Sequence, residues 1–390
     1  MLNQDYTTKL LDLEEVIIKN VEKDAQSLHI HIELPKKEHH CPNCNTTTSR
    51  IHDYRIQVIK DIPLGKKTIL YLRKRRYGCP CCGKRFYEHN SFLGRYRRAT
   101  KRMISAVIEY FRKLCPASEI ASTYNISTTT ALRYFDAVNY GATKLPEVLS
   151  IDEFKGNAAG QKYQTILTNP KDKTVLDILP NRYESDLIRY FNGCFEREKV
   201  KYFVTDMNPH FRNVAKICFP QAKIIADRFH VIRQAVWAME RVRKNEQQRL
   251  SERFRKYFKH SKYLLKKPID RLTDVEKDRL ALMLEISPKL AEAYRLKNEF
   301  QEIMRAETSL IGKPLLIAWL YTVEAMELPE FRDCTRACRN WFTEILNSID
   351  YPWSNGFTEG CNNKTKVLKR VCFGVRNFKR FRNRILHCAN

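Results

Sequence analysis

The chain has 390 residues, and its 70 Lys and Arg outnumber its 44 Asp and Glu, which gives a formal net charge of +26. Apolar residues make up 43% of the sequence. That share is enough for ordinary cores and excludes a largely disordered basic chain. So large a positive charge favours a polyanionic partner, most often nucleic acid. No signal peptide, membrane-spanning segment or amphipathic anchor is visible, so we expect a soluble intracellular protein without a membrane partner.

The first candidate site is a pair of CxxC motifs that follows the strand-like residues 1–40. The motifs are Cys41 with Cys44 and Cys79 with Cys82, and each contains or borders a turn-forming Pro or Gly. Two such turns present four thiolates to one tetrahedral metal ion, and the 34 residues between them are long enough for a β-hairpin. We therefore predict one structural zinc ion. Unrelated core cysteines are the alternative explanation.

The positive charge gathers in two stretches. Residues 60–102 hold 14 Lys and Arg against two acids, and residues 360–390 hold nine and no acid. A solvated face is the ordinary explanation of one such run. Two runs in a chain with a predicted zinc module favour contact with nucleic acid.

Helical spacing begins after residue 99. A predicted helix from Ala117 to Tyr124 meets a short turn, and Ser127 is a good N-cap for a second helix. Small apolar residues occupy the positions that form the inner core of a helix-turn-helix motif. The second helix of such a motif enters the major groove of DNA. Here it would present Thr128, Thr129, Thr130 and Arg133. An ordinary helical hairpin is the alternative.

From about residue 147, short apolar strands alternate with helices in the order βββαβαβ. This order predicts a mixed sheet with helices on its faces. Asp152 lies within the first strand and Asp206 ends the fourth, so their carboxylates are neighbours if these strands pair. Glu359, on a later helix, supplies a third carboxylate.

Three carboxylates without a matching lysine predict divalent cations, and oxygen ligands favour magnesium or manganese. Two such ions activate a water or a 3′-hydroxyl and stabilise the leaving oxygen in phosphodiester displacement. For any single Asp, a helix cap or a surface charge is the alternative.

Several stretches carry a resemblance to a known family. They are SIDEF from Ser150, VTDM from Val204, ADRFHV from Ala226, and the long block WSNGFTEGCNNKTKVLKR from Trp353, followed by FGVRNFKRFRNR from Phe373. With the cysteine module and the helix-turn-helix pattern, they resemble bacterial insertion-sequence transposases of the ISL3 family. These enzymes belong to the DDE group, which has an RNase H-like catalytic core. The resemblance covers nearly the whole chain.

The resemblance implies a role for each matching residue. Asp152, Asp206 and Glu359 would form the DDE triad and hold the two catalytic ions. Asp227 and His230 match a D-x-x-H motif that supports the active site without binding the metal directly; a helix cap with a core histidine is the alternative.

Four basic residues recur at helical spacing after Glu359 and would hold phosphates beside the active site: Lys364, Lys366, Lys369 and Arg370. Five more would extend this DNA-binding surface: Arg376, Lys379, Arg380, Arg382 and Arg384. Generic solubility charge is the alternative for the later part of the run. Tyr351 and Trp353 would either stack on a distorted DNA end or pack the start of the helix.

The implied architecture is multidomain α+β. Its segments are the amino-terminal strands and zinc-ribbon DNA-binding module at 1–98, a helix-turn-helix domain at 99–146, the first part of an RNase H-like core at 147–230, an all-helical insertion at 231–345, and the carboxyl-terminal helix of the core with a basic tail at 346–390.

The family implies a transposase that binds the inverted repeats of an insertion sequence, cleaves both ends and joins them to target DNA. Double-stranded DNA is the expected partner, at least a dimer is expected on it, and the bacterial cytoplasm at the nucleoid is the expected location. A catalytically inactive DNA-binding derivative is one alternative. An RNase H-like nuclease or resolvase, which cleaves DNA without joining ends, is another.

Overall fold

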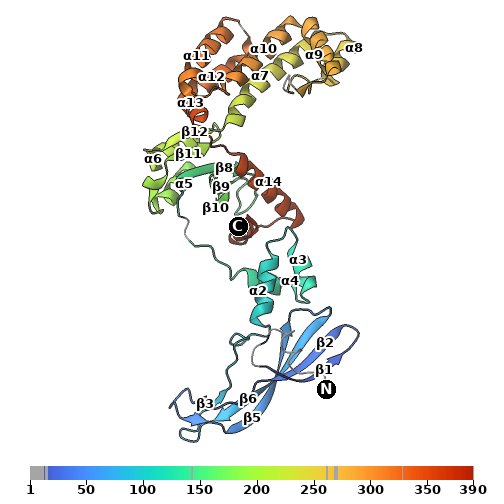
Figure 1. Cartoon of the computed structure of the whole chain (residues 1–390), viewed down its shortest axis with the longest axis vertical. Coiled ribbons are helices and arrows are strands. Elements are labelled where there is room, and N and C mark those ends of the chain that lie inside the picture. Colours follow the sequence, from blue (N-terminus) through green and yellow to red (C-terminus); the bar gives the residue numbers. More distant parts are fainter. Residues whose placement is uncertain are drawn as a thin grey trace. The chain divides into compact units, whose positions relative to one another are not determined.

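A computed structural model describes residues 13, 16–141, 144–260, 262–267, 271–326 and 328–389. Contacts within the chain divide it into two compact units. The first unit holds the described residues up to Tyr140, together with Val367–Val375 and Asn383–Cys388. The second holds those of Gly141–Lys366 and Arg376–Arg382. The division therefore falls within the last two helices, which are red in Figure 1.

The first unit contains a five-stranded sheet (Figure 1). Its strands, in spatial order, are β1 (Ile17–Lys23), β2 (Ser27–Glu33), β6 (Lys67–Gly78) and β5 (Ile51–Asp61), with β7 (Arg85–Tyr87) also paired to β6. Strands β2 and β6 are parallel, and the other neighbours are antiparallel. Alternate residues such as Ile30, Ile59 and Leu70 bury one face. Since β5 and β6 form an antiparallel pair between the two CxxC motifs, the predicted hairpin is confirmed.

Three helices follow in the first unit: α2 (Lys101–Tyr110), α3 (Ala117–Thr123) and α4 (Thr128–Phe135). The side chain of Ser127 accepts a hydrogen bond from the backbone N–H of Thr130, so the predicted N-cap is confirmed. Ile120 of α3 and Ala131 of α4 are fully buried in a shared core. Asn125, in the turn, has a positive φ of 53°, a conformation that Asn tolerates better than most residues.

The second unit contains the predicted mixed sheet. Its strands, in spatial order, are β10 (Thr174–Leu179), β9 (Gln164–Asn169), β8 (Val148–Phe154), β11 (Tyr202–Thr205) and β12 (Lys223–Ala226). The pairs β10–β9 and β9–β8 are antiparallel, whereas β8–β11 and β11–β12 are parallel. The connecting helices are α5 (Glu184–Asn192), the short 3₁₀ helix η1 (Arg197–Lys199) and α6 (Pro209–Cys218).

One face of this sheet is covered by α5 and α6. Leu187 of α5 and Phe211 of α6 belong to the same buried cluster as Leu149 of β8 and Phe203 of β11. The buried runs on β8, β9 and β11 are nearly continuous rather than alternating. Strands of this kind are covered on both faces, and the opposite face is the one that carries the candidate site.

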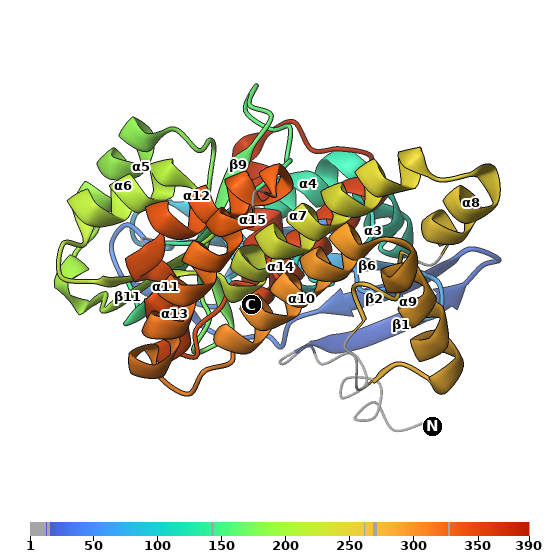
Figure 2. The same cartoon turned by 90° about the horizontal axis from the view of Figure 1, so that it is seen from above.

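Between β12 and the last part of the sheet domain, the described chain is helical, as predicted. The elements are α7 (Arg228–Arg249), α8 (Glu252–His260), α9 (Asp274–Ile286), α10 (Pro288–Ile303), α11 (Ser309–Ala325), η3 (Pro329–Phe331), α12 (Arg332–Asn340) and α13 (Phe342–Asp350). Helices α7 and α10 lie side by side (Figure 2). They share one large apolar cluster, to which Val242, Leu296 and Trp319 belong. The first of these helices begins at Arg228, a few residues before the predicted start.

The chain ends with α14 (Gly356–Val371) and α15 (Phe378–Ala389). Among the described residues, no helix is long and apolar enough to cross a membrane.

Candidate active site

The four predicted zinc ligands lie together in the first unit. The sulfur of Cys44 is 3.4 Å from those of Cys79 and Cys82, and the sulfurs of Cys41 and Cys82 are 3.5 Å apart. All four lie within 4.8 Å of one another. These separations fit four thiolates about 2.3 Å from one tetrahedral zinc ion. The neighbouring Cys81 is exposed and lies outside this cluster, so the four clustered cysteines are those of the two CxxC motifs.

Each CxxC motif closes with the same backbone turn. The N–H of Asn45 donates to the carbonyl of Cys41 at 2.9 Å, and the N–H of Gly83 donates to that of Cys79 at 3.1 Å. Both Asn45 and Gly83 have positive φ, 60° and 68°. The equivalent turns hold the two pairs of thiols toward one point, as a structural zinc site with no open coordination position requires.

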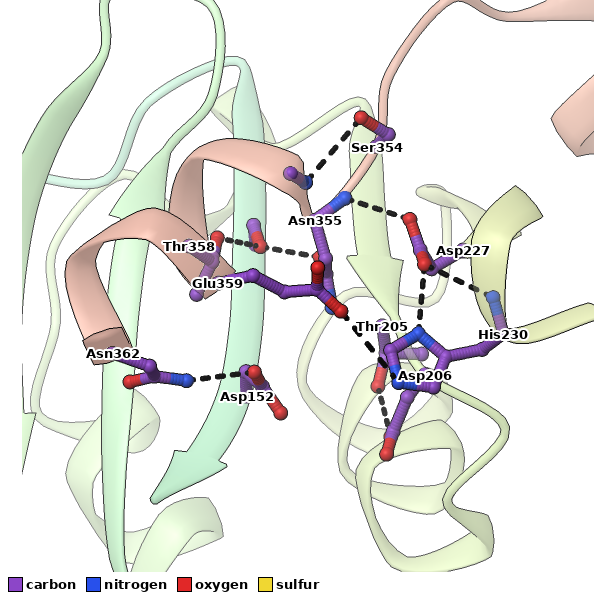
Figure 3. Close-up of polar contacts among 12 residues, drawn as sticks. Asp152, Thr205, Asp206, Asp227, His230, Ser354, Asn355, Thr358, Glu359 and Asn362 are labelled. Carbon is purple, nitrogen blue, oxygen red and sulfur yellow. Dashed lines mark hydrogen bonds and ion pairs between the residues drawn. The ribbon is translucent and has the colours of Figure 1, made fainter. Parts of the chain in front are cut away.

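In the second unit, sheet pairing aligns the first two candidate carboxylates. Strands β8 and β11 are parallel, with Val204 opposite Ser150. Asp152 and Asp206 each lie two residues further along, so they reach the same level on neighbouring strands. The first and fourth strands therefore pair, which is the condition under which the two carboxylates were expected to be neighbours. Glu359 lies in the first turn of α14, and in Figure 3 it stands between the two aspartates in the view.

These carboxylates are poorly compensated electrostatically. Burial raises the pKa of Asp152 from 3.8 to about 7 against the opposing hydrogen bond from the N–H of Glu153, and the negative charges of Asp206 and Glu359 act in the same direction as burial. Burial also raises the pKa of Asp206. Within the described residues, the ion pair made by these three carboxylates is between Glu359 and Nε2 of His230, at 3.8 Å. The partner in this pair is therefore a histidine and not a Lys or Arg.

A buried set of hydroxyl and amide groups joins α14 to the sheet (Figure 3). The hydroxyl of Ser150 donates to Oδ1 of Asn355 at 2.6 Å and lies 2.8 Å from the hydroxyl of Thr358. The hydroxyl of Thr358 is also 2.7 Å from that of Thr168 on β9. All four side chains are completely buried. This polar contact, which we call the α14 anchor, determines where the next residue, Glu359, projects.

Asp227 and His230 approach the same helix from the start of α7. Asp227 caps α7, and its Oδ2 accepts from both the backbone N–H of His230, at 3.2 Å, and its ring Nδ1, at 2.7 Å. Its Oδ1 accepts from the backbone N–H of Asn355 at 2.9 Å. The hydrogen bonds hold the pKa of Asp227 below its usual value despite burial. The second ring nitrogen of His230 faces Glu359.

The cluster of Asp227, His230 and Glu359 also has the geometry of a metal-ligand set, since its ligand atoms lie within 4.8 Å of one another. Both oxygens of Asp227 are already hydrogen-bonded, however. This arrangement fits an orienting role for the D-x-x-H pair better than direct metal binding.

Asn362 is a residue of the site that sequence reasoning missed. Its Nδ2 donates to Oδ2 of Asp152 at 2.8 Å (Figure 3). Its own Oδ1 is buried and has no hydrogen-bond partner within the described structure. The signal was present, because Asn355, Thr358 and Asn362 all lie in the long motif around Glu359. Asn355 and Thr358 precede Glu359 by four residues and by one residue, and Asn362 follows it by three. At these spacings the three polar side chains form a row along one side of α14.

The candidate DNA-binding residues differ in exposure. Thr128, Thr129 and Arg133 of α4 are exposed, and Thr130 is half-buried. On α14, Lys364, Lys366 and Arg370 are exposed and Lys369 is half-buried; Arg376 and Lys379 are exposed and Arg380 is half-buried.

The prediction that Arg384 extends a DNA-binding surface is wrong. Only 4% of Arg384 is exposed, and its guanidinium donates to the carbonyls of Lys113 and Cys115 at 2.8 Å each. It also lies over the ring of Phe111 at 4.6 Å. A helix that packs into the first unit places this arginine inside, where backbone carbonyls and an aromatic face replace water.

Arg382 also makes a contact within the protein, with a buried carboxylate of the second unit. Its Nε donates to Oδ1 of the buried Asp177 at 2.5 Å, and Asp177 also accepts from the hydroxyl of Tyr190 at 2.8 Å. Tyr351 and Trp353 pack beside the buried valines and isoleucine of the sheet, each near the ring of Tyr202. Of the two roles weighed for them, packing is the one that this arrangement favours.

Two models of known protein families match this chain. A model of the ISL3 transposases, described as "Transposase", matches residues 149–385. A model described as the zinc-finger of the transposases IS204, IS1001, IS1096 and IS1165 matches residues 37–82.

Relatives are similar over different lengths. The transposase for insertion sequence element IS1001 of Bordetella parapertussis is 24% identical over 92% of this chain and 91% of its own length. The transposase for IS1557 of Mycobacterium tuberculosis is 22% identical over 55% of this chain and 54% of its own. A Lactococcus lactis protein named as an ATP-dependent protease is 32% identical, but over only 31% of this chain and 37% of its own length. Because the transposase model covers more than half of the sequence, the chain belongs to the ISL3 family of transposases.

Proposed function

We propose that this chain is a catalytically active DDE transposase, which cleaves the ends of an insertion sequence and joins them to target DNA through Asp152, Asp206 and Glu359. The observation that carries the proposal is the mutual repulsion of these three carboxylates: Asp206, at the end of β11, and Glu359, on α14, both act electrostatically on Asp152 of β8. In the described structure, the ion pair within this set is with His230 and not with a Lys or Arg. Partly buried carboxylates that repel one another are unfavourable unless a cation joins them.

The residues fit divalent cations. All three side chains supply oxygen ligands, the type that magnesium and manganese prefer. The buried Oδ1 of Asn362, which lacks a partner beside Asp152, is an acceptor that the water shell of a hydrated cation would satisfy. When bound, a pair of such ions supplies an activated water or 3′-hydroxyl and stabilises the leaving oxygen of the phosphodiester.

The neighbouring residues orient the acids. The α14 anchor holds the helix on the sheet. The ring of His230, which is hydrogen-bonded to Asp227, faces the carboxylate of Glu359. Lys364 and Lys366, exposed on the same helix, are suited to hold the phosphates that flank the scissile bond. The sheet order β10-β9-β8-β11-β12, with two acids on the adjacent strands β8 and β11, supports an RNase H-like core.

Recognition of the element's ends falls to the zinc module and to α4 in this proposal. Thr128, Thr129 and Arg133 are exposed on the second helix of a capped helix-turn-helix pattern, as reading the major groove requires. Two ends have to be held together before joining, so we expect at least two copies of the chain on DNA. Such a protein would act at the bacterial nucleoid.

The test is a cleavage and strand-transfer assay on DNA that carries the flanking repeats of the element encoding this chain. Wild type is compared with Glu359→Gln and with Glu252→Gln, which changes an exposed glutamate of α8. Nicking and joining that need magnesium or manganese and are lost only in Glu359→Gln support the proposal. Specific binding without cleavage favours an inactive DNA-binding derivative, and cleavage without joining favours a nuclease or resolvase.

A further inference from the structure

Helix α7 carries an exposed aromatic stripe next to the carboxylates. Phe229, Arg233 and Trp237 are spaced four residues apart and so share one face of the helix. Phe229 is 59% exposed and Trp237 is 46% exposed. The guanidinium of Arg233 lies 5.6 Å from the ring centre of Phe229 and 4.6 Å from that of Trp237. We call these three residues the α7 stripe.

Exposure of Trp237 distinguishes it from the other tryptophans. Trp319 and Trp341 are 3% and 4% exposed, within the helical core, and Trp353 is half-buried against the sheet. Large aromatic side chains usually contribute to a core, so two of them aligned on a solvent-facing helix suggest a contact made only with a partner.

The position of the stripe points to the same substrate as the active site. The ring of Phe229 meets that of His230 edge to face, with centres 5.6 Å apart, and His230 faces Glu359. The stripe therefore starts beside the candidate catalytic carboxylates. From Phe229 to Trp237 the helix rises by eight residues, or about 12 Å, the length of roughly three to four nucleotides of one strand.

The chemistry of the stripe selects the partner. Aromatic faces stack on nucleobases, and an arginine between them adds cation–π attraction. Arg233 is half-buried against both rings, and its Nε has no hydrogen-bond partner within the described structure. A second copy of the chain is a less favourable occupant, because both copies carry a net charge of +26.

We propose that the α7 stripe binds unpaired bases of the DNA strand next to the scissile phosphate. Bases of a duplex are already stacked on one another, so only unpaired bases present free faces to Phe229 and Trp237. The inference rests on the proposed function, since it assigns a part of the DNA to a surface beside the same active site.

The experiment compares two DNAs in EDTA, so that binding is measured without cleavage. One is a fully paired duplex that contains the terminal repeat and its flank, and the other has three mismatched base pairs at their junction. Since stacking contributes about 1–3 kcal/mol per base, wild type is expected to bind the mismatched DNA roughly 5- to 150-fold more tightly. In Trp237→Ala this preference falls to less than about a third of the wild-type ratio, while affinity for the paired DNA is unchanged.

Two further variants separate stacking from general damage. Trp237→Phe retains an aromatic face and is expected to keep most of the preference. Tyr321→Ala removes an aromatic residue of α11 that is 64% exposed and also lies near an arginine, and it is expected to change nothing. Because Trp237 is the exposed tryptophan of the chain's four, quenching of intrinsic fluorescence by the mismatched DNA should also disappear in Trp237→Phe.

The inference would be overturned if Trp237→Ala preferred the mismatched DNA as strongly as wild type does. It would also be overturned if wild type bound the two DNAs with equal affinity. A change in oligomeric mass in Trp237→Ala, with the DNA preference intact, would assign the stripe to a protein interface and overturn it as well. Failure of wild type to bind either DNA would overturn the proposed function together with the inference. A mismatch preference that depends on Trp237, without metal-dependent cleavage, would overturn only the catalytic proposal.

Discussion

The α14 anchor makes a quantitative prediction about Thr358, whose hydroxyl links α14 to the sheet. Thr358→Val keeps the shape of the side chain and removes only this hydroxyl. Ser150 retains its hydrogen bond to Asn355. Thr168 loses its partner, because Thr358 is the group that its hydroxyl bonds within the described structure. The substitution therefore leaves one buried hydroxyl unsatisfied inside a completely buried contact.

The expected cost follows from that orphaned group. Hydrogen bonds to Thr358 contribute about 0.5–1.5 kcal/mol each, and an unsatisfied buried hydroxyl costs about 1–3 kcal/mol. We expect Thr358→Val to lower the free energy of unfolding by about 2–3 kcal/mol. Thr168→Val alone leaves Thr358 bonded to Ser150 and is expected to cost about 1 kcal/mol. In the double variant no hydroxyl is orphaned, so its stability should exceed that of Thr358→Val.

Urea unfolding of the full chain, followed by circular dichroism and tryptophan fluorescence, measures these differences. The cleavage assay is the second measurement. Since Glu359 follows Thr358 directly, activity should fall in the single variant and recover in part in the double variant. A double variant destabilised by the sum of the two single effects or more would refute the reasoning, as would a Thr358→Val protein as stable as wild type.

Other substitutions test separate parts of the chain. Burial lowers the pKa of Lys297, which is 1% exposed, from 10.5 to about 8. Between pH 8 and 10.5 the unfolded chain therefore binds more protons than the folded chain, so the free energy of unfolding rises with pH in that range. Lys297→Met should accordingly stabilise the chain by up to roughly 3 kcal/mol at pH 7, with a gain that shrinks toward pH 10 in urea titrations, and a gain independent of pH would contradict this account. Cys44→Ser should release zinc, measured with a chromogenic chelator, and weaken binding to the terminal repeat; normal specific binding would speak against the zinc assignment. Asp206→Asn should abolish cleavage but leave DNA affinity largely intact in a mobility-shift assay, whereas loss of binding would place Asp206 in a structural role.

Much of the second unit was predictable because its chemistry is local. Strand-length apolar runs alternating with helical spacing predicted the order βββαβαβ, and the parallel pairing of β8 with β11 then brings Asp152 and Asp206 together. The zinc site was predictable for the same reason, since a CxxC turn determines its own geometry. Ser127 caps α4 as its position before a run of threonines indicated.

Contacts between distant segments could not be predicted in this way. In a run of nine basic residues each arginine looks solvated, yet Arg384 is buried because carbonyls more than 260 residues earlier in the chain accept its hydrogen bonds. The role of Asn362 depends on Asp152, 210 residues away. No spacing rule within a helix reports such a partner, because helical periodicity shows which residues share a face and not what the face meets.

Helices α14 and α7, beside the carboxylates, show why hydropathy does not predict which residues are buried near the candidate site. Helix α14 buries Thr358, Asn362 and Thr365, although its polar sequence suggests a solvated surface. Helix α7 exposes Phe229 and Trp237, although aromatic residues suggest a core. Each inversion is unfavourable for folding alone: buried polar groups need partners on the sheet, and exposed rings forgo burial. Departures of this kind are expected where a surface is shaped for a ligand rather than for stability, and here both lie beside the carboxylates that we propose to act on DNA.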